Sequence, residues 1–239
     1  EMRQDKDVIE LVLGDTGKAR YPITIDPTTT ISGAANIDDT LLLNLTNADI
    51  NFGANSAFRS GRLSAGGIQR TVLRVPTASI PAGTITAGRI KVTRLANVNS
   101  INPDTMSVYR VAPANVWGES TATWNKVNGV DNWAGSAGCS TSGTDYIADA
   151  SPPSLAYAAN TGGADDGLKT VPTIAAWFTG WRDVTYANSG MFIRTDNEVE
   201  TGNLFAGYSS DSGTTPLYVE IDYTTGSPIA CLLPRMSHD

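Results

Sequence analysis

The chain has 239 residues, of which 41% are hydrophobic and only 17% are charged, and 24 acidic against 17 basic residues give a net charge of −7. An acidic chain argues against nucleic acid as a general partner, because phosphate binding needs a basic surface. The single histidine, His238, argues against a histidine base or an imidazole metal site. No run approaches the roughly 20 apolar residues of a membrane span, so we expect no membrane insertion.

Short runs rich in Val, Ile, Leu, Thr and Tyr alternate along the chain with Gly, Pro, Asn and Asp, which is the pattern of strands and turns. Parallel βαβ units lack the helices they would need. We therefore predict an all-β fold, a two-sheet antiparallel β-sandwich of the jelly-roll type with long loops. The predicted strands lie near residues 8–13, 20–25, 40–45, 70–75, 88–95, 105–111, 189–194, 203–208 and 216–223.

Three stretches do not read as simple strands. Residues 170–181, "TVPTIAAWFTGW", fit a helix and a strand equally well. Residues 112–135 and 136–169 predict two long irregular segments, and loops of this length are usually functional or packed across a sheet face.

After Tyr223 the chain has Gly and Pro breaks and then a short apolar run, which predicts a linker or tail at residues 225–239. Because the chain starts at Glu1 without a methionine, we also expect it to be a piece of a larger protein.

Two of the predicted strands carry basic residues on one face. In residues 89–94, "RIKVTR", Ile90 and Val92 alternate with Arg89 and Lys91, which is typical of a strand with one buried face. The same alternation in residues 70–75 places two arginines opposite the apolar side chains. If these strands are neighbours, their polar faces predict one basic patch made of Arg70, Arg74, Arg89 and Lys91.

Five motifs occur in a recognisable order along the chain. They are "INFGANSAFRSG" (50–61), "RTVLRVPTASIPAGTITAGRIKVTR" (70–94), "VYRVAPANVWGESTATWN" (108–125), "AAWFTGW" with "NSGMFIR" (175–194) and "FAGYSSDSGTTPLYVEIDY" (205–223). With these motifs the sequence resembles the DNRLRE-type domain, which is grouped with carbohydrate-binding modules of the alginate-binding kind and with disaggregatase-associated domains. The resemblance implies a non-catalytic jelly-roll module at residues 36–224, preceded by a lead-in segment at 1–35, within a larger secreted, cell-surface or virion protein. It also implies that basic residues on a sheet face form the ligand surface.

The basic patch has two interpretations. Arginine forks hold sugar carboxylates or sulfates in a bidentate way, which predicts that the patch binds an acidic polysaccharide or a cell-surface glycan. The alternative is an ordinary solvated strand face whose cations are balanced by nearby acids.

Five tryptophans are candidates for stacking on sugar rings. Trp133, between Asn132 and Gly135 in a loop, is the best candidate for a ligand contact. The resemblance suggests instead that Trp117 and Trp124 pack a long loop against the sandwich, and Trp177 and Trp181 are expected to cap the same core.

No catalytic residues are expected. The paired acids Asp165 with Asp166 and Glu198 with Glu200 could serve a glycosidase, but each pair lies in an apparent turn and reads as solvated loop acids. A lyase or hydrolase stays a minor alternative.

We also expect no cofactor, although structural calcium stays open. Asp38, Asp39, Asp49 and Asn51 offer oxygen ligands of the kind that calcium binds. The two cysteines, Cys139 and Cys231, have no metal-like spacing, and whether they form a disulfide is left open.

The sequence thus favours a glycan-binding, adhesive module that is extracellular or lies on a cell surface or virion. The alternative function is a virion structural subunit, such as a phage decoration, fibre or tail protein, whose partners are other protein chains through strand pairing.

Overall fold

A computed structural model describes residues 2–5, 8–11, 27–95 and 101–225 of the chain. The strands of the main body are short, and in chain order they are β3 (Thr28–Ser32), β4 (Asp38–Leu43), β5 (Ala57–Arg62), β6 (Ile68–Arg74), β7 (Thr84–Arg94), β8 (Asp104–Arg110), β9 (Ser154–Tyr157), β10 (Gly167–Pro172), β11 (Met191–Thr195), β12 (Asn203–Tyr208) and β13 (Tyr218–Thr224). The remaining elements are a separate hairpin of β1 (Met2–Asp5) with β2 (Val8–Leu11), three 3-10 turns η1 (Leu45–Asn47), η2 (Thr77–Ser79) and η3 (Thr161–Gly163), and one helix, α1 (Ala175–Arg182).

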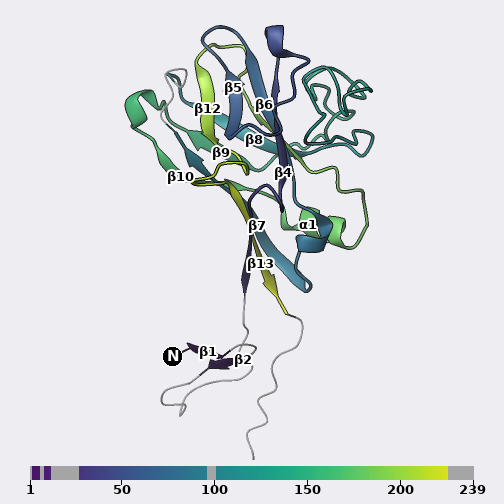
Figure 1. The fold of residues 1–239 in the computed structure, drawn as a ribbon, viewed down its shortest axis with the longest axis vertical. Coiled ribbons are helices and arrows are strands. Elements are labelled where there is room, and N and C mark those ends of the chain that lie inside the picture. The colour runs from purple at the N-terminus through teal and green to yellow at the C-terminus, as the bar shows by residue number, and fades with distance from the viewer. Residues whose placement is uncertain (1, 6–7, 12–26, 96–100, 226–239) are drawn as a thin grey trace, which may run out of the picture.

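Eleven antiparallel strands form one continuous hydrogen-bonded sheet that folds over on itself into a jelly-roll sandwich (Figure 1). The strand order is β3-β13-β7-β12-β5-β6-β11-β8-β9, with β10 paired to the other side of β7 and β4 paired to β6. One layer is built around β3, β13, β7 and β10, and the other around β4, β6, β11 and β8. The predicted all-β jelly-roll class is confirmed.

The main core lies between these two layers. Ile90 and Val92 of β7 point into it from one layer, and Leu73 of β6 and Ile193 of β11 point into it from the other. Because side chains alternate along a strand, the residues between these positions must point outward. The two layers therefore present two outer faces on opposite sides of the molecule.

A second hydrophobic cluster lies outside the sandwich, on the outer face of β4, β6, β11 and β8. Residues 112–147, which we call the covering segment, pack on this face, as the teal and green coil beside β4 shows (Figure 1). The cluster combines sheet residues with residues of the covering segment and its approach, namely Leu42, Val72 and Phe192 with Val111, Trp117, Ala122, Val127, Trp133, Cys139 and Tyr146. The covering segment therefore forms a third layer, which buries the outer face of β4, β6, β11 and β8.

Residues 170–181 turn out to contain both of the alternatives that their sequence allows. Strand β10 ends at Pro172, and α1 begins three residues later. Trp177, Phe178 and Trp181 of α1 are buried in the main core, where the helix closes one end of the sandwich. A Cβ atom on Gly88 of β7 would lie 2.2 Å from the ring of Phe178, so glycine is what lets the helix approach the strand.

The predicted strands that fall on described residues match β2, β4, β6, β7, β8, β11, β12 and β13 within a few residues. Strands β1, β3, β5, β9 and β10 are absent from the prediction. Strand β5 is polar and contains Gly61, where a Cβ atom would clash with the carbonyl oxygen of Asn203. Strand β3 pairs with β13, so the sheet begins at Thr28, inside the expected lead-in segment. The predicted strand at 20–25 lies outside the described residues.

Within the described part of the chain, no helix is long and apolar enough to cross a membrane.

Candidate functional site: an open sheet face

The two outer faces of the sandwich differ in what covers them. The covering segment buries the outer face of β4, β6, β11 and β8. On the other layer, the outward side chains of β3, β13, β7 and β10 are exposed or half-buried. We call this surface the open face, and it consists of Thr28, Thr30, Ser32, Tyr218, Glu220, Asp222, Arg89, Lys91, Thr93, Leu168, Thr170 and Pro172.

The register of the four strands arranges these residues in rows across the open face. In one row Tyr218 lies between Ser32 and Lys91, and Thr170 lies on the far side of Lys91. In the next row Glu220 lies beside Arg89. Directly opposed side chains on one face of a sheet lie about 5 Å apart, so each row is a contiguous strip of polar groups with one aromatic ring.

The charges of the open face are balanced. Arg89 pairs with Asp222 and lies 3.4 Å from Glu220, and Lys91 Nζ lies 3.4 Å from Glu220 and donates to Thr170 Oγ1 at 2.9 Å. The hydrogen bond from Arg89, followed by that from the Thr28 hydroxyl, lowers the pKa of Asp222. The hydrogen bond to Asp222 in turn raises the pKa of Arg89. Both cations are therefore held in place by neighbouring carboxylates.

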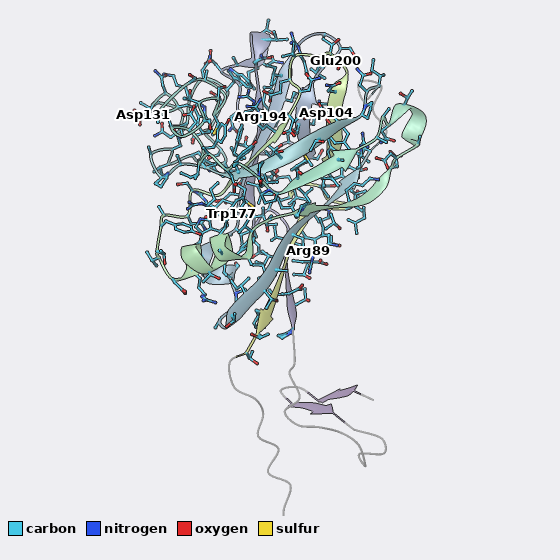
Figure 2. The ribbon with its side chains drawn as sticks, turned by 180° about the vertical axis from the view of Figure 1, so that it is seen from behind. Arg89, Asp104, Asp131, Trp177, Arg194 and Glu200 are labelled. Atoms are coloured by element: carbon cyan, nitrogen blue, oxygen red, sulfur yellow. The ribbon has the colours of Figure 1, made fainter. Side chains whose placement is uncertain are left out.

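The predicted patch of four cations does not form. Strands β6 and β7 belong to opposite layers, and their apolar residues meet in the shared core. Their basic side chains therefore point away from each other, with Arg89 and Lys91 on the open face and Arg70 and Arg74 under the covering segment. Figure 2 labels Arg89 on the long strand β7, well apart from Asp131 in the covering segment.

Arg70 is a buried structural residue, contrary to the expected ligand contact. It is 5% exposed and makes a bidentate pair with Glu198, at 2.7 and 2.6 Å. It also donates to the carbonyl oxygen of Gly138, and its guanidinium lies 4.9 Å from the ring centre of Trp124. These contacts tie the covering segment to β6 and leave no access for a polysaccharide.

Arg74 also interacts with residues of the protein itself, at the start of the covering segment. Its Nε donates to Asp38 at 2.9 Å, and its guanidinium lies 4.9 Å from the ring centre of Trp117. The arginine therefore positions the start of the covering segment on strand β6.

Trp133 does not present a ring face to solvent, which corrects its assignment as a ligand contact. The side chain is 3% exposed, and its Nε1 donates to the carbonyl oxygen of Thr123 at 3.1 Å. Trp117 is likewise buried and donates to Ser189, and Trp124 packs against the same cluster. The three tryptophans hold the covering segment on the sheet, because they fill its interior.

The paired acids are used in ion pairs and hydrogen bonds. Asp165 pairs with Arg94 and with Lys169, and Glu198 pairs with Arg70 and Arg194. Lys169, followed by Arg94, lowers the pKa of Asp165. Asp166 accepts from Asn160, and Glu200 accepts from Asn102 and Asn197.

Most of the expected calcium ligands have protein partners. Asp38 pairs with Arg74, Asp49 accepts from Asn125 at 2.8 Å, and the Asn51 amide donates to backbone carbonyls of the covering segment. Asp39 accepts from the backbone N–H and hydroxyl of Ser210. Cys139 is buried, and burial raises the pKa of its thiol. Cys231 lies outside the described residues, so whether it forms a disulfide with Cys139 stays open.

The residues of the open face that the sequence analysis overlooked are on β13. In residues 217–223, "LYVEIDY", Tyr218, Glu220 and Asp222 alternate with Val219 and Ile221, which is the same two-residue period that marked β7. This alternation was a usable signal. The alternation predicts which side chains share a face of the strand. It does not predict which strands lie next to each other, because strand pairing depends on the tertiary fold.

The chain was compared with protein families and with curated proteins. Residues 30–148, which run from within β3 through β8 and the covering segment, match the family model of Carbohydrate-binding module family 96. No curated protein matches the chain. The family match supports a carbohydrate-binding module, a class that is in general non-catalytic, with a glycan as its partner.

Proposed function

We propose that this module binds glycan chains on the open face, with Tyr218, Arg89 and Lys91 as principal contacts. The observation that carries the proposal is that the covering segment buries one sheet face while the other stays accessible and presents rows of hydroxyl, carboxylate, cationic and aromatic groups. The motifs shared with the DNRLRE-type domain and alginate-binding modules support the same assignment. The module would act outside the cell, as part of a larger surface or virion protein.

The chemistry of the open face suits a polysaccharide. Sugar hydroxyls both donate and accept hydrogen bonds, and the Thr hydroxyls, Glu220 and Lys91 provide both kinds of partner. The half-buried ring of Tyr218 offers an apolar surface for the C–H face of a sugar and loses little side-chain freedom on binding. Four strands span roughly 15 Å, which gives an extended chain room to lie across the sheet.

We further propose a preference for acidic polysaccharides, carried by Arg89 and Lys91. Arg89 is occupied by Asp222, whereas Lys91 lies at the longer distance of 3.4 Å from Glu220. A sugar carboxylate can therefore compete for the Lys91 ammonium more easily than for the Arg89 guanidinium. Because the site is accessible to solvent, this part of the affinity should fall as salt concentration rises.

Calorimetry with a uronic-acid polymer and a neutral glucan tests both parts of the proposal. Lys91→Ala should weaken binding of the acidic polymer about tenfold or more, since a charge-assisted hydrogen bond contributes about 1.5–3 kcal/mol. Tyr218→Ala should weaken binding of both polymers. Lys126→Ala removes the same charge from the covering segment and should leave binding unchanged. Equal loss in the Lys126 variant, or binding unaffected by both open-face variants, refutes the assignment.

The second candidate is a structural subunit that joins other protein chains, and strand β3 favours it. Among the described strands, β3 pairs only with β13, so its outer edge offers backbone groups to a further strand. Mass measurement in solution separates the two functions. A monomer at micromolar concentration argues against assembly through β3, whereas a stable oligomer without glycan affinity favours it.

A further inference from the structure

Three carboxylates from distant parts of the chain meet at the edge of the covering segment. Asp39 comes from β4, Glu119 from the covering segment, and Asp211 from the loop between β12 and β13. One oxygen from each lies within 4.8 Å of the others. We call this group the carboxylate cluster. The backbone N–H of Asp39 donates to Glu119 at 2.9 Å, which fixes two of its members relative to each other.

The carboxylate cluster contains a buried oxygen that has no hydrogen-bond donor among the described residues. Asp211 Oδ2 is buried and accepts from no described group. Asp39 is only 2% exposed, and its Oδ1 accepts from the N–H and hydroxyl of Ser210, whereas no described group donates to its Oδ2. Buried polar atoms normally have a partner, so the unfilled acceptor on Asp211 needs an explanation.

Other buried carboxylates of this protein are fully satisfied. Glu198 receives hydrogen bonds from Arg70 and Arg194, and Asp145 receives them from backbone N–H groups such as those of Gly135, Ser136 and Thr141. No described ion pair includes a member of the carboxylate cluster, and the nearby Arg74 pairs with Asp38 instead. The fold supplies Glu198 with cations and Asp145 with several backbone donors, whereas the described residues place no cation in an ion pair with the carboxylate cluster.

The pKa values of all three members of the carboxylate cluster are raised. Burial raises the pKa of Asp39 to about 7, and the like charges of Asp211 and Glu119 oppose its ionisation as well. Burial also raises the pKa of Glu119 and of Asp211. A bound cation would remove the unfavourable repulsion among the three groups.

We propose that Asp39, Glu119 and Asp211 bind a calcium ion. The donors are all carboxylate oxygens, which hard cations prefer, and neither histidine nor cysteine contributes to the cluster. Three carboxylates supply three to six of the six to eight oxygens that calcium takes, and water can complete the shell. Calcium accepts varied arrangements of oxygen ligands, such as those from one strand and two loop segments, whereas magnesium demands near-ideal octahedral geometry.

The position of the site indicates what the ion does. It connects β4, the covering segment and the β12–β13 loop, so it would fasten the third layer to the sandwich. None of its three carboxylates belongs to a strand or a residue of the open face, so calcium would stabilise the fold without contacting glycan there. The inference is therefore independent of the proposed glycan site.

Calcium titration into the chelator-treated full chain tests the proposal. Calorimetry should give one binding event per chain, and saturating calcium should raise the midpoint of thermal unfolding by several degrees. Magnesium at the same concentration should produce a much smaller shift. Asp211→Asn should weaken calcium binding at least tenfold, and Glu119→Gln should do the same.

Asp49→Asn is the matched control, because it removes an exposed carboxylate near the covering segment that is not part of the cluster. This variant should bind calcium as the wild type does. The proposal is overturned if calcium gives neither heat nor a thermal shift at pH 7.5, or if both cluster variants retain wild-type affinity. Terbium luminescence provides a second readout that does not depend on stability, and it should be lost in the cluster variants and kept in the control.

Discussion

Replacing Trp133 with alanine distinguishes a packing role from a ligand role for the tryptophans of the covering segment. The side chain is 3% exposed, belongs to the outer hydrophobic cluster and donates to Thr123. Removing a buried Trp or Phe side chain costs about 3–5 kcal/mol, and the carbonyl of Thr123 would also lose its donor, at about 1 kcal/mol. We expect Trp133→Ala to lower the free energy of unfolding by about 4 kcal/mol.

Urea unfolding followed by circular dichroism measures this loss, and calorimetry on the still-folded variant measures glycan affinity. Trp133→Phe keeps an aromatic ring without the indole N–H and should lose less, about 1–2 kcal/mol. Glycan affinity should be unchanged in both variants, since the ring is far from the open face. A loss of affinity with stability intact would refute the packing argument, as would a stability loss below 1 kcal/mol for the alanine variant.

Two further predictions concern the sandwich itself. The pKa of Asp165 is lowered by Lys169 and Arg94, so its pairing stabilises the fold above the ordinary pKa of an aspartate and is lost as pH falls through the lowered value. Asp165→Asn should therefore lower the free energy of unfolding at pH 7 by about 1–3 kcal/mol. The difference from wild type, measured by urea unfolding, should shrink towards pH 3. A difference that does not change with pH would contradict this reasoning. Gly88→Ala places a methyl group against Phe178 and should lower the stability measured by thermal unfolding by about 1–3 kcal/mol. Adding Phe178→Leu to this variant should recover part of the loss. An unchanged unfolding midpoint in Gly88→Ala alone would show that α1 does not pack tightly against this strand.

The third layer explains why this chain has so few charges and such long segments between strands. A sandwich with two solvated faces needs polar residues on the outside of both sheets, but here Val72 and Phe192 point outward and are buried. The covering segment makes those outward positions a second core. It leaves the open face as the accessible face of the sandwich, where we propose that glycan binds.

Strand identity could be predicted from the sequence where local alternation is strong. In "RIKVTR" the alternation of Ile90 and Val92 with Arg89 and Lys91 assigned each side chain to the correct side of β7. Strand β10 has one buried residue, Val171, and is held by backbone pairing to β7, so its side chains carried no comparable pattern. Pairing of this kind depends on a partner nearly 80 residues away in sequence.

By itself, the sequence determined the all-β class and the direction of the side chains in residues 89–94, because these depend on composition and local periodicity, and the family resemblance added the packing role of Trp117 and Trp124. Only the tertiary structure decided which polar faces meet. It separated Arg70 and Arg74 from Arg89 and Lys91, buried Trp133, and brought Asp39, Glu119 and Asp211 together. The physical reason is that each of these outcomes is set by the layer to which a strand belongs and by what packs over that layer, and both are fixed by contacts between residues far apart in the chain.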